Sequence, residues 1–231
     1  ESGVGVQLFQ LPWASIADEC EQNLGPAGFG WVLTSPPQEH ITGDAWWIQY
    51  QPVSYLLESS LGTREEFADM VSRCDDAGVA IIADAVINHM TGQDVPGVGI
   101  AGSEYEHHEY PGIYTAADFH RCGLTAEDDI EDYRDRAQVQ TCELVNLADL
   151  DTASPTVRAT IVAYLDDLLS LGVDGFRIDA AKHMAADDVA AIVGELPEGT
   201  RIISEVIRGA AEPVQPEEYT AFGEVFEFTY A

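Results

Sequence analysis

Basic residues are scarce in this 231-residue chain, which has 10 lysines and arginines against 41 acidic residues and a formal charge of −31. Its only lysine is Lys182. Nucleic acids and anionic membrane surfaces bind proteins through faces rich in cations, so this composition excludes both classes of partner. Hydrophobic residues still make up 46% of the chain, which is enough apolar material for a large core and argues against disorder.

Long apolar runs are also missing. No window approaches the roughly 18 apolar residues of a membrane span, and Glu1-Ser2-Gly3 has none of the positive charge of a signal peptide. We therefore expect no membrane segment. Because the chain starts without Met and ends on a strand-like run at residues 226–231, we expect it to be a piece of a longer protein.

The cysteines show no C-x-x-C spacing, which excludes the common redox and zinc motifs. The four residues, which permit three disulfide pairings, are Cys20, Cys74, Cys122 and Cys142. In a reducing compartment they would be core thiols, whereas in a secreted protein we expect two bridges.

Short apolar runs alternate with amphipathic helical patterns along most of the chain. The periodicity predicts helices over residues 64–77 and 156–171, which Gly78 and Gly172 end. Such alternation is typical of parallel βαβ units, in a barrel or a doubly wound sheet. The predicted strands are residues 4–9, 30–34, 79–83, 175–179, 201–205 and 225–230.

Residues 88–149 break this alternation, with many Gly, Asp, Glu, His and Tyr residues and no clear helical period. A structureless loop of this length is uncommon inside a domain, so we predict an inserted subdomain after the third strand. A (β/α)₈ barrel takes about 250 residues, and this chain carries only about its first six strands. The predicted organisation is a TIM-type barrel at 1–87, the insertion at 88–149, and the barrel continued at 150–231.

Three predicted strands end in an acidic residue, namely Asp84, Asp179 and Glu205. The carboxyl ends of parallel strands meet at one edge, where such folds build their sites. Arg177 and Asp179 share one face of their strand, so the guanidinium should lower the pKa of Asp179 and keep it ionised. The apolar strand before Glu205 favours the protonated acid. Such a pair suits glycoside hydrolysis, although barrel-lining salt bridges would explain the spacing equally well.

The motifs around these acids resemble ordered signature regions of the α-amylase family of glycoside hydrolases, closest to its animal-type and actinobacterial members. A fourth region, Leu147-Ala148-Asp149-Leu150, resembles the end of that family's inserted domain, and the resemblance runs nearly end to end. The three motifs are Asp84-Ala85-Val86-Ile87-Asn88-His89, Gly175-Phe176-Arg177-Ile178-Asp179-Ala180-Ala181-Lys182-His183 and Glu205-Val206-Ile207.

The resemblance implies that Asp179 is the nucleophile and Glu205 the general acid and base of a retaining enzyme. It further implies a set of substrate-binding residues, among which Arg177 would orient the nucleophile and contribute to a chloride site. The family's third catalytic acid, in a His-Asp motif after the seventh strand, has no counterpart here, so we expect that the piece alone could be inactive. The implied substrate-binding residues are Trp47, Tyr50, Asp84, His89, Tyr133, Arg177, Lys182, His183 and Glu212.

A structural calcium ion is also implied by the resemblance. Its ligands would be Asn88, Asp149 and the backbone carbonyls of Gln140 and His183, a set of oxygens that suits Ca²⁺. The implied disulfides are Cys20–Cys74 and Cys122–Cys142, which favour secretion. We assign no metal role to the adjacent His107 and His108, because neighbours along a chain seldom point to one centre, and we expect a solvated loop there. His40 and His120 receive no role either.

The predicted function is endo-hydrolysis of α-1,4-glucosidic linkages in starch or glycogen by a secreted, calcium-bound protein that is a monomer when full length. The alternatives are an oligosaccharide-acting α-glucosidase or transglycosylase of the same family, an inert fragment or relative that only binds glucan, and an acidic calcium buffer. Asp179 and Glu205 argue against the non-catalytic relative, and the lack of repeated Asp-x-Asp loops argues against the buffer. Starch gains nothing from an acidic protein surface, so we attribute the charge of −31 to solubility at high salt.

Overall fold

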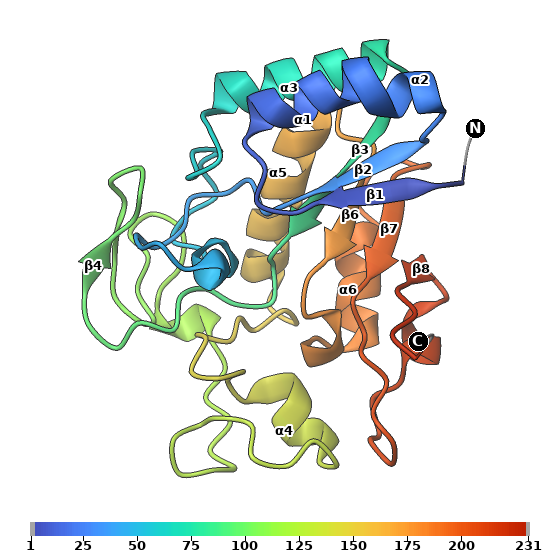
Figure 1. Cartoon of the computed structure of the whole chain (residues 1–231). Helices are drawn as coiled ribbons and strands as arrows, with labels where there is room; N and C mark the ends of the chain where they lie inside the picture. The colour runs from blue at the N-terminus through green and yellow to red at the C-terminus, as the bar shows by residue number, and fades with distance from the viewer. Residues whose placement is uncertain (1–2, 230–231) are drawn as a thin grey trace.

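The computed structural model describes residues 3–229 and contains a curled parallel sheet of six strands in the order β1-β2-β3-β6-β7-β8 (Figure 1). Each strand pairs with its neighbours in parallel register, as βαβ units require. This curled sheet is part of a TIM-type barrel, as the alternating pattern predicted. The strands are β1 (Gly5–Leu8), β2 (Trp31–Thr34), β3 (Ala80–Ala85), β6 (Gly175–Ile178), β7 (Arg201–Ser204) and β8 (Glu224–Val225).

Helices cover the convex face of the sheet, and α1 and α3 lie side by side in Figure 1. Thr63 caps α3 through a reciprocal capping box with Glu66, which explains where that helix begins. Phe176 and Ile178 of β6 are fully buried among the helical side chains of the main core. The helices are α1 (Trp13–Glu19), the π-helix η1 (Cys20–Leu24), α2 (Gly25–Ala27), α3 (Arg64–Asp76), α5 (Pro155–Ser170) and α6 (Ala186–Val193), with 3₁₀ turns η2 (Trp46–Tyr50), η4 (Ala181–His183) and η5 (Pro216–Tyr219).

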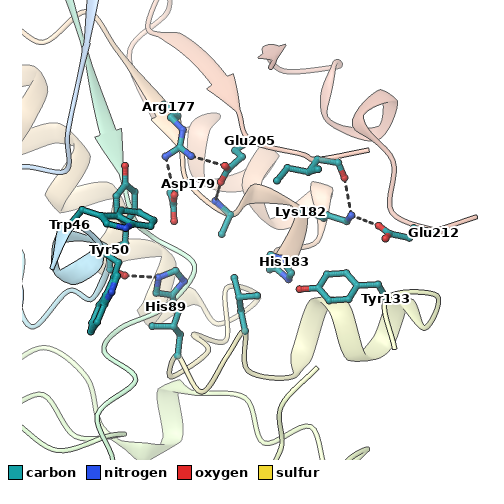
Figure 2. Close-up of a pocket in the computed structure, with 15 residues that line it drawn as sticks. Trp46, Tyr50, His89, Tyr133, Arg177, Asp179, Lys182, His183, Glu205 and Glu212 are labelled. Carbon is teal, nitrogen blue, oxygen red and sulfur yellow. Dashed lines mark hydrogen bonds and ion pairs between the residues drawn. The ribbon is translucent and has the colours of Figure 1, made fainter. Parts of the chain in front are cut away.

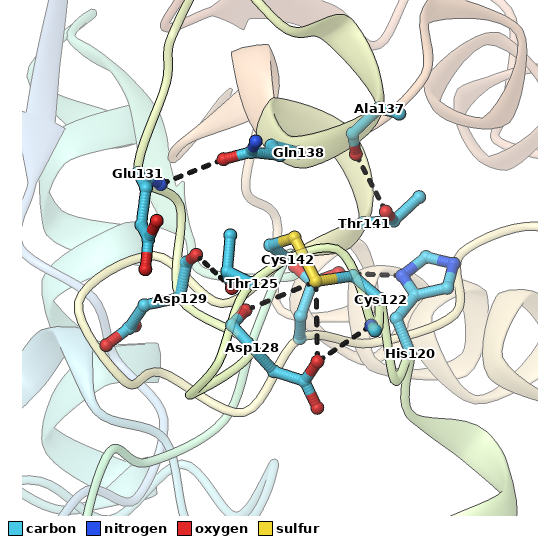
Figure 3. The surroundings of a disulfide bond; sticks show 12 residues. His120, Cys122, Thr125, Asp128, Asp129, Glu131, Ala137, Gln138, Thr141 and Cys142 are labelled. Carbon is cyan, nitrogen blue, oxygen red and sulfur yellow. Dashed lines mark hydrogen bonds and ion pairs between the residues drawn. A yellow bond between two sulfur atoms is a disulfide. The ribbon is translucent and has the colours of Figure 1, made fainter.

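The segment after β3 forms a loop-rich lobe, green to yellow in Figure 1, with few regular elements. The Cys122–Cys142 disulfide lies in this lobe, and Figure 3 shows Asp128 beside it, where its carboxylate accepts a 2.8 Å hydrogen bond from the Gly123 amide. The second disulfide, Cys20–Cys74, joins η1 to α3, so the structure contains both implied pairings. The lobe's elements are β4 (Gly97–Val98), β5 (Glu104–Tyr105), η3 (Ala116–Asp118) and α4 (Arg136–Thr141).

The prediction for the last strand is mostly wrong. Residues 225–230 were expected to be extended, but β8 covers only Glu224–Val225, and no strand is assigned from Phe226 to Thr229; Tyr230 lies outside the described residues. The Phe226 amide still donates to the carbonyl of Ser204 at 3.1 Å. Among the described residues β8 has β7 as its only strand neighbour, so alternating side chains alone do not extend the pairing.

Candidate active site

The acidic strand ends meet at one rim of the sheet because β3, β6 and β7 are neighbours. Asp84 and Ile203 lie in register with Arg177 on either side of it, so their side chains point to the same concave face. Asp179 and Glu205 follow two residues later on their strands and point the same way. The sequence prediction that these acids converge is therefore confirmed.

Arg177 lies at the centre of this acidic rim and contacts all three carboxylates. Its Nη1 donates to Oδ1 of Asp84 at 2.5 Å. The same Nη1 donates to Oδ1 of Asp179 at 2.9 Å, while Nη2 lies 2.8 Å from Oε1 of Glu205 (Figure 2). Its side chain is 10% exposed, so the ion pairs are shielded from water. One cation thus fixes the positions of both predicted catalytic acids.

Burial sets the protonation of this cluster. It raises the pKa of Asp179 to about 8, with a further contribution from the negative charges of Asp84 and Glu205, even though Arg177 acts in the opposite direction. Burial likewise raises the pKa of Asp84. Arg177 thus lowers the pKa of Asp179 as predicted, but the prediction that it keeps Asp179 ionised is wrong, because one guanidinium cannot compensate both the loss of solvent and two neighbouring acids.

Ala180 has a left-handed backbone, with φ of 47° and ψ of 32°. Such a conformation is uncommon for a residue with a Cβ atom and is often found at functional sites. Its amide donates a 2.9 Å hydrogen bond to Oε2 of Glu205. The bend after Asp179 therefore positions the second acid, a role that the sequence analysis did not assign to Ala180.

A cavity of about 590 Å³ opens above Asp179 and Glu205. The exposed indole rings of Trp46 and Trp47 lie at its edge, with exposed fractions of 60% and 44%. The pair is therefore not the core pair that adjacent tryptophans usually form. Other predicted substrate-binding residues that line this cavity are Tyr50, His89, Tyr133, Arg177, Lys182, His183 and Glu212.

Asp84 is the predicted substrate-binding residue that does not line the cavity. Its carboxylate is fully buried and accepts a 2.8 Å hydrogen bond from the Tyr50 hydroxyl as well as the bond from Arg177. Asp84 thus influences the cavity indirectly, by holding the side chains of Tyr50 and Arg177 in its wall.

Two histidines of the cavity wall are anchored to backbone carbonyls. Nε2 of His89 lies 2.9 Å from the carbonyl oxygen of Tyr50, and Nδ1 of His183 lies 3.0 Å from that of Val139. Burial lowers the pKa of both histidines to about 4, so each ring is neutral at neutral pH. Nδ1 of His89 also lies 3.2 Å from Nδ2 of Asn88, so both nitrogens of that ring are engaged, whereas His183 can still offer Nε2 to a polar ligand.

Lys182 is 6% exposed, so it is not a surface lysine. Its Nζ donates to the carbonyl of Ile207 at 2.8 Å and forms an ion pair with Glu212, and it lies 5.5 Å from the centre of the Tyr133 ring (Figure 2). These contacts place three predicted substrate-binding residues side by side at one end of the cavity.

The residues implied for calcium come from neighbouring segments. Asn88 and Asp149 are both buried, and Leu150 donates its amide to the carbonyl of Asn88 at 3.0 Å. Within residues 3–229, Oδ1 of Asn88 is a buried acceptor without a hydrogen-bond partner, which is what an oxygen ligand looks like in the absence of its cation. Gln140 follows Val139, whose carbonyl contacts His183, so the other two implied donors also come from adjacent segments. This donor chemistry fits Ca²⁺.

His107 and His108 do not form the solvated loop that was expected. Both rings are largely buried and direct their Nε2 atoms at the carboxylate of Glu143. Sequence reasoning missed this because Glu143 lies 35 residues beyond His108.

The comparisons agree with the resemblance. The family model for the alpha amylase catalytic domain matches residues 128–230. Over 232 residues the chain is 49% identical to an alpha-amylase of Streptomyces violaceus, covering 100% of this chain and 40% of that protein. The chain belongs to the α-amylase family. An alpha-amylase-related protein of Drosophila atripex is 48% identical over 244 residues, covering 98% of this chain and 48% of its own length.

Among solved structures, a variant of alpha-amylase I from Eisenia fetida in complex with maltohexaose aligns with a TM-score of 0.94 and 38% identity, covering 98% of this chain and 49% of that one. The chain thus spans less than half the length of these α-amylase family members. No helix among the described residues is long and apolar enough to cross a membrane.

Proposed function

We propose that the protein in which this chain occurs hydrolyses internal α-1,4-glucosidic bonds of starch or glycogen with retention of configuration. The observation that carries this proposal is the shared guanidinium of Arg177, which holds Asp179 and Glu205 at the floor of one cavity. Two carboxyl groups held together beside a sugar-sized cavity are the machinery of a glycosidase, and a guanidinium shared by both suits the short separation that retaining enzymes use.

In this mechanism the Asp179 carboxylate attacks the anomeric carbon while Glu205 gives its proton to the leaving glycosidic oxygen. A covalent glycosyl-enzyme forms, and Glu205 then takes a proton from the water that attacks the anomeric carbon and releases Asp179. The raised pKa of Asp179 means that the cluster holds a proton at neutral pH. The mechanism requires Asp179 to be ionised when it attacks, so its carboxyl group must give up that proton when the substrate binds.

The cavity wall supplies the binding groups. Trp47 and Tyr50 would stack on glucose rings, His183 would bind a sugar hydroxyl through Nε2, and Lys182, Tyr133 and Glu212 would contact the leaving-group side. The ring of His89, held at both nitrogens, would contact the sugar as part of the cavity wall. Arg177 is already bound to three carboxylates, and a chloride ion beside it stays a prediction.

Calcium would be held by Oδ1 of Asn88, Asp149 and the carbonyls of Gln140 and His183. It would supply no reaction step, only a link between the loop-rich lobe and the barrel. We further propose that the full-length protein is a secreted monomer, which the two disulfides favour.

The test is product analysis on starch with the full-length protein. Early release of long oligosaccharides supports internal cleavage, glucose alone would indicate an α-glucosidase, and transfer products would indicate a transglycosylase. NMR of the first product should show the α-anomer if configuration is retained.

The acid is tested by Glu205→Gln, which should bind starch normally but lose roughly 10²–10⁴-fold in kcat. Glu198→Gln, an exposed residue, is the matched control and should keep full turnover. A wild type that binds starch without turning it over would favour a glucan-binding protein.

A further inference from the structure

Three side chains of the loop-rich lobe converge outside the active site. Nε2 of His108 lies 2.7 Å from Oε1 of Glu143, and Nε2 of His107 lies 3.2 Å from Oε2. All three ligand atoms lie within 4.8 Å of one another. Glu143 is 5% exposed and the two histidine side chains 15% and 11%, so the group is shielded yet reachable from solvent.

The two ring nitrogens of His107 face different partners, a backbone carbonyl at Nδ1 and the Glu143 carboxylate at Nε2. Its Nδ1 lies 3.3 Å from the carbonyl oxygen of Gln93, which can only accept, so Nδ1 carries the hydrogen. In a protonated ring Nε2 donates to the Glu143 carboxylate, and a metal ion bound between Nε2 and that carboxylate would take the place of this proton. A histidine whose other nitrogen donates to a backbone carbonyl is the common arrangement of a metal ligand.

The charges at this cluster favour one divalent cation bound between the three side chains over one proton on each histidine. The rings of His107 and His108 lie 4.2 Å apart, so protonating both would place two cations beside one carboxylate. A single cation between the three ligand atoms would instead contact all of them favourably. The carboxylate of Asp94 adds negative charge near His107, and the whole chain carries a net charge of −31.

We infer that His107, His108 and Glu143 bind one divalent transition-metal ion, for which zinc is the best match. Two imidazoles and one carboxylate suit zinc, whereas calcium takes six to eight oxygen ligands. Water would complete the coordination. The ion would link the loop after β5 to the residue that follows Cys142, and so would stabilise a lobe with few regular elements. This site is independent of the proposed hydrolysis.

The test is calorimetric titration of the full chain with ZnCl₂ in the presence of excess Ca²⁺. We expect one zinc ion per chain, and roughly a 100-fold or greater loss of affinity in His107→Gln/His108→Gln, since even removing groups that support ligands costs 10–100-fold. Glu106→Gln, an exposed neighbour, is the control and should bind zinc like the wild type. Absence of stoichiometric binding, or unchanged affinity in the double variant, overturns the inference.

A spectroscopic readout separates loss of ligands from loss of fold. Co²⁺ bound to the wild type should give the d–d absorption of a four-coordinate site, and the single variants His108→Gln and Glu143→Gln should alter or abolish it while their circular dichroism stays native. A six-coordinate cobalt spectrum identical in all variants would show that the ion binds elsewhere.

Discussion

Nη1 of Arg177 lies 2.5 Å from Oδ1 of Asp84, and the two residues are register partners on adjacent strands. Asp84 has no exposed surface, so this ion pair belongs to the interior of the barrel. The pair therefore couples the alignment of β3 and β6 to the position of the guanidinium that holds Asp179 and Glu205.

Replacing this cation should destabilise the fold. Arg177→Gln leaves the buried carboxyl groups of Asp84 and Asp179, and the partly exposed one of Glu205, without their partner, so we expect the free energy of unfolding to fall by about 3–5 kcal/mol at pH 7. The matched control is Arg64→Gln, whose pair with Asp167 is 40% exposed on each side and should contribute less than about 1 kcal/mol. Urea unfolding of both variants measures the difference, and equal losses would contradict the central role of Arg177.

The raised pKa of Asp179 predicts a pH-dependent gain in stability for Asp179→Asn. Folding favours the neutral acid, so wild-type stability should fall as pH rises from about 4, the ordinary value of an unfolded Asp, to about 8. The variant cannot ionise there, so its Tm advantage should be absent near pH 4, grow to pH 8 and then stay constant. Each kcal/mol corresponds to about 2–4 °C in a domain of this size.

Thermal melts across pH 4–9 measure this advantage, with Asp44→Asn, an exposed residue, as the control. The control should show a pH-independent difference from wild type. An advantage of Asp179→Asn that shrinks as pH rises would mean that Arg177 outweighs burial.

Calcium removal should lower the Tm if Asn88 and Asp149 bind the ion. A chelator is expected to destabilise the wild type by several degrees, because a ligand that binds only the folded state stabilises it. Asn88→Ala removes the unpartnered Oδ1 and should melt like the chelated wild type, with little further response to chelator. A full chelator response in Asn88→Ala would remove that residue from the ligand set.

The charge of −31 predicts that salt stabilises the protein. Screening reduces repulsion among the acidic side chains, since the Debye length shrinks from about 10 Å at 0.1 M to about 3 Å at 1 M. The unfolding midpoint should therefore rise with NaCl. Sucrose at matched osmolality serves as the control for general exclusion effects, and an equal rise in both would show that charge is not responsible.

The acids at the strand ends could be predicted, because each of them directly follows an apolar run and both features can be read in a few consecutive residues. The alternation of side chains correctly placed Arg177 and Asp179 on one face. The pKa of Asp179 could not be predicted, because it depends first on burial in the folded barrel and then on Asp84 and Glu205, which come from other parts of the chain. For the same reason the convergence of His107 and His108 on Glu143 was missed, since only the folded lobe brings that carboxylate to the rings.

The only ε-amino group in the chain, that of Lys182, lies in the wall of the active-site cavity. Reagents that acylate amines at neutral pH usually modify many surface lysines, so the extent of modification cannot be assigned to any one of them. On this chain the same reagents would meet a single side-chain target, which is paired with Glu212 and lines the cavity. Protection of that amine by an oligosaccharide would thus measure occupancy of the site without any need for turnover.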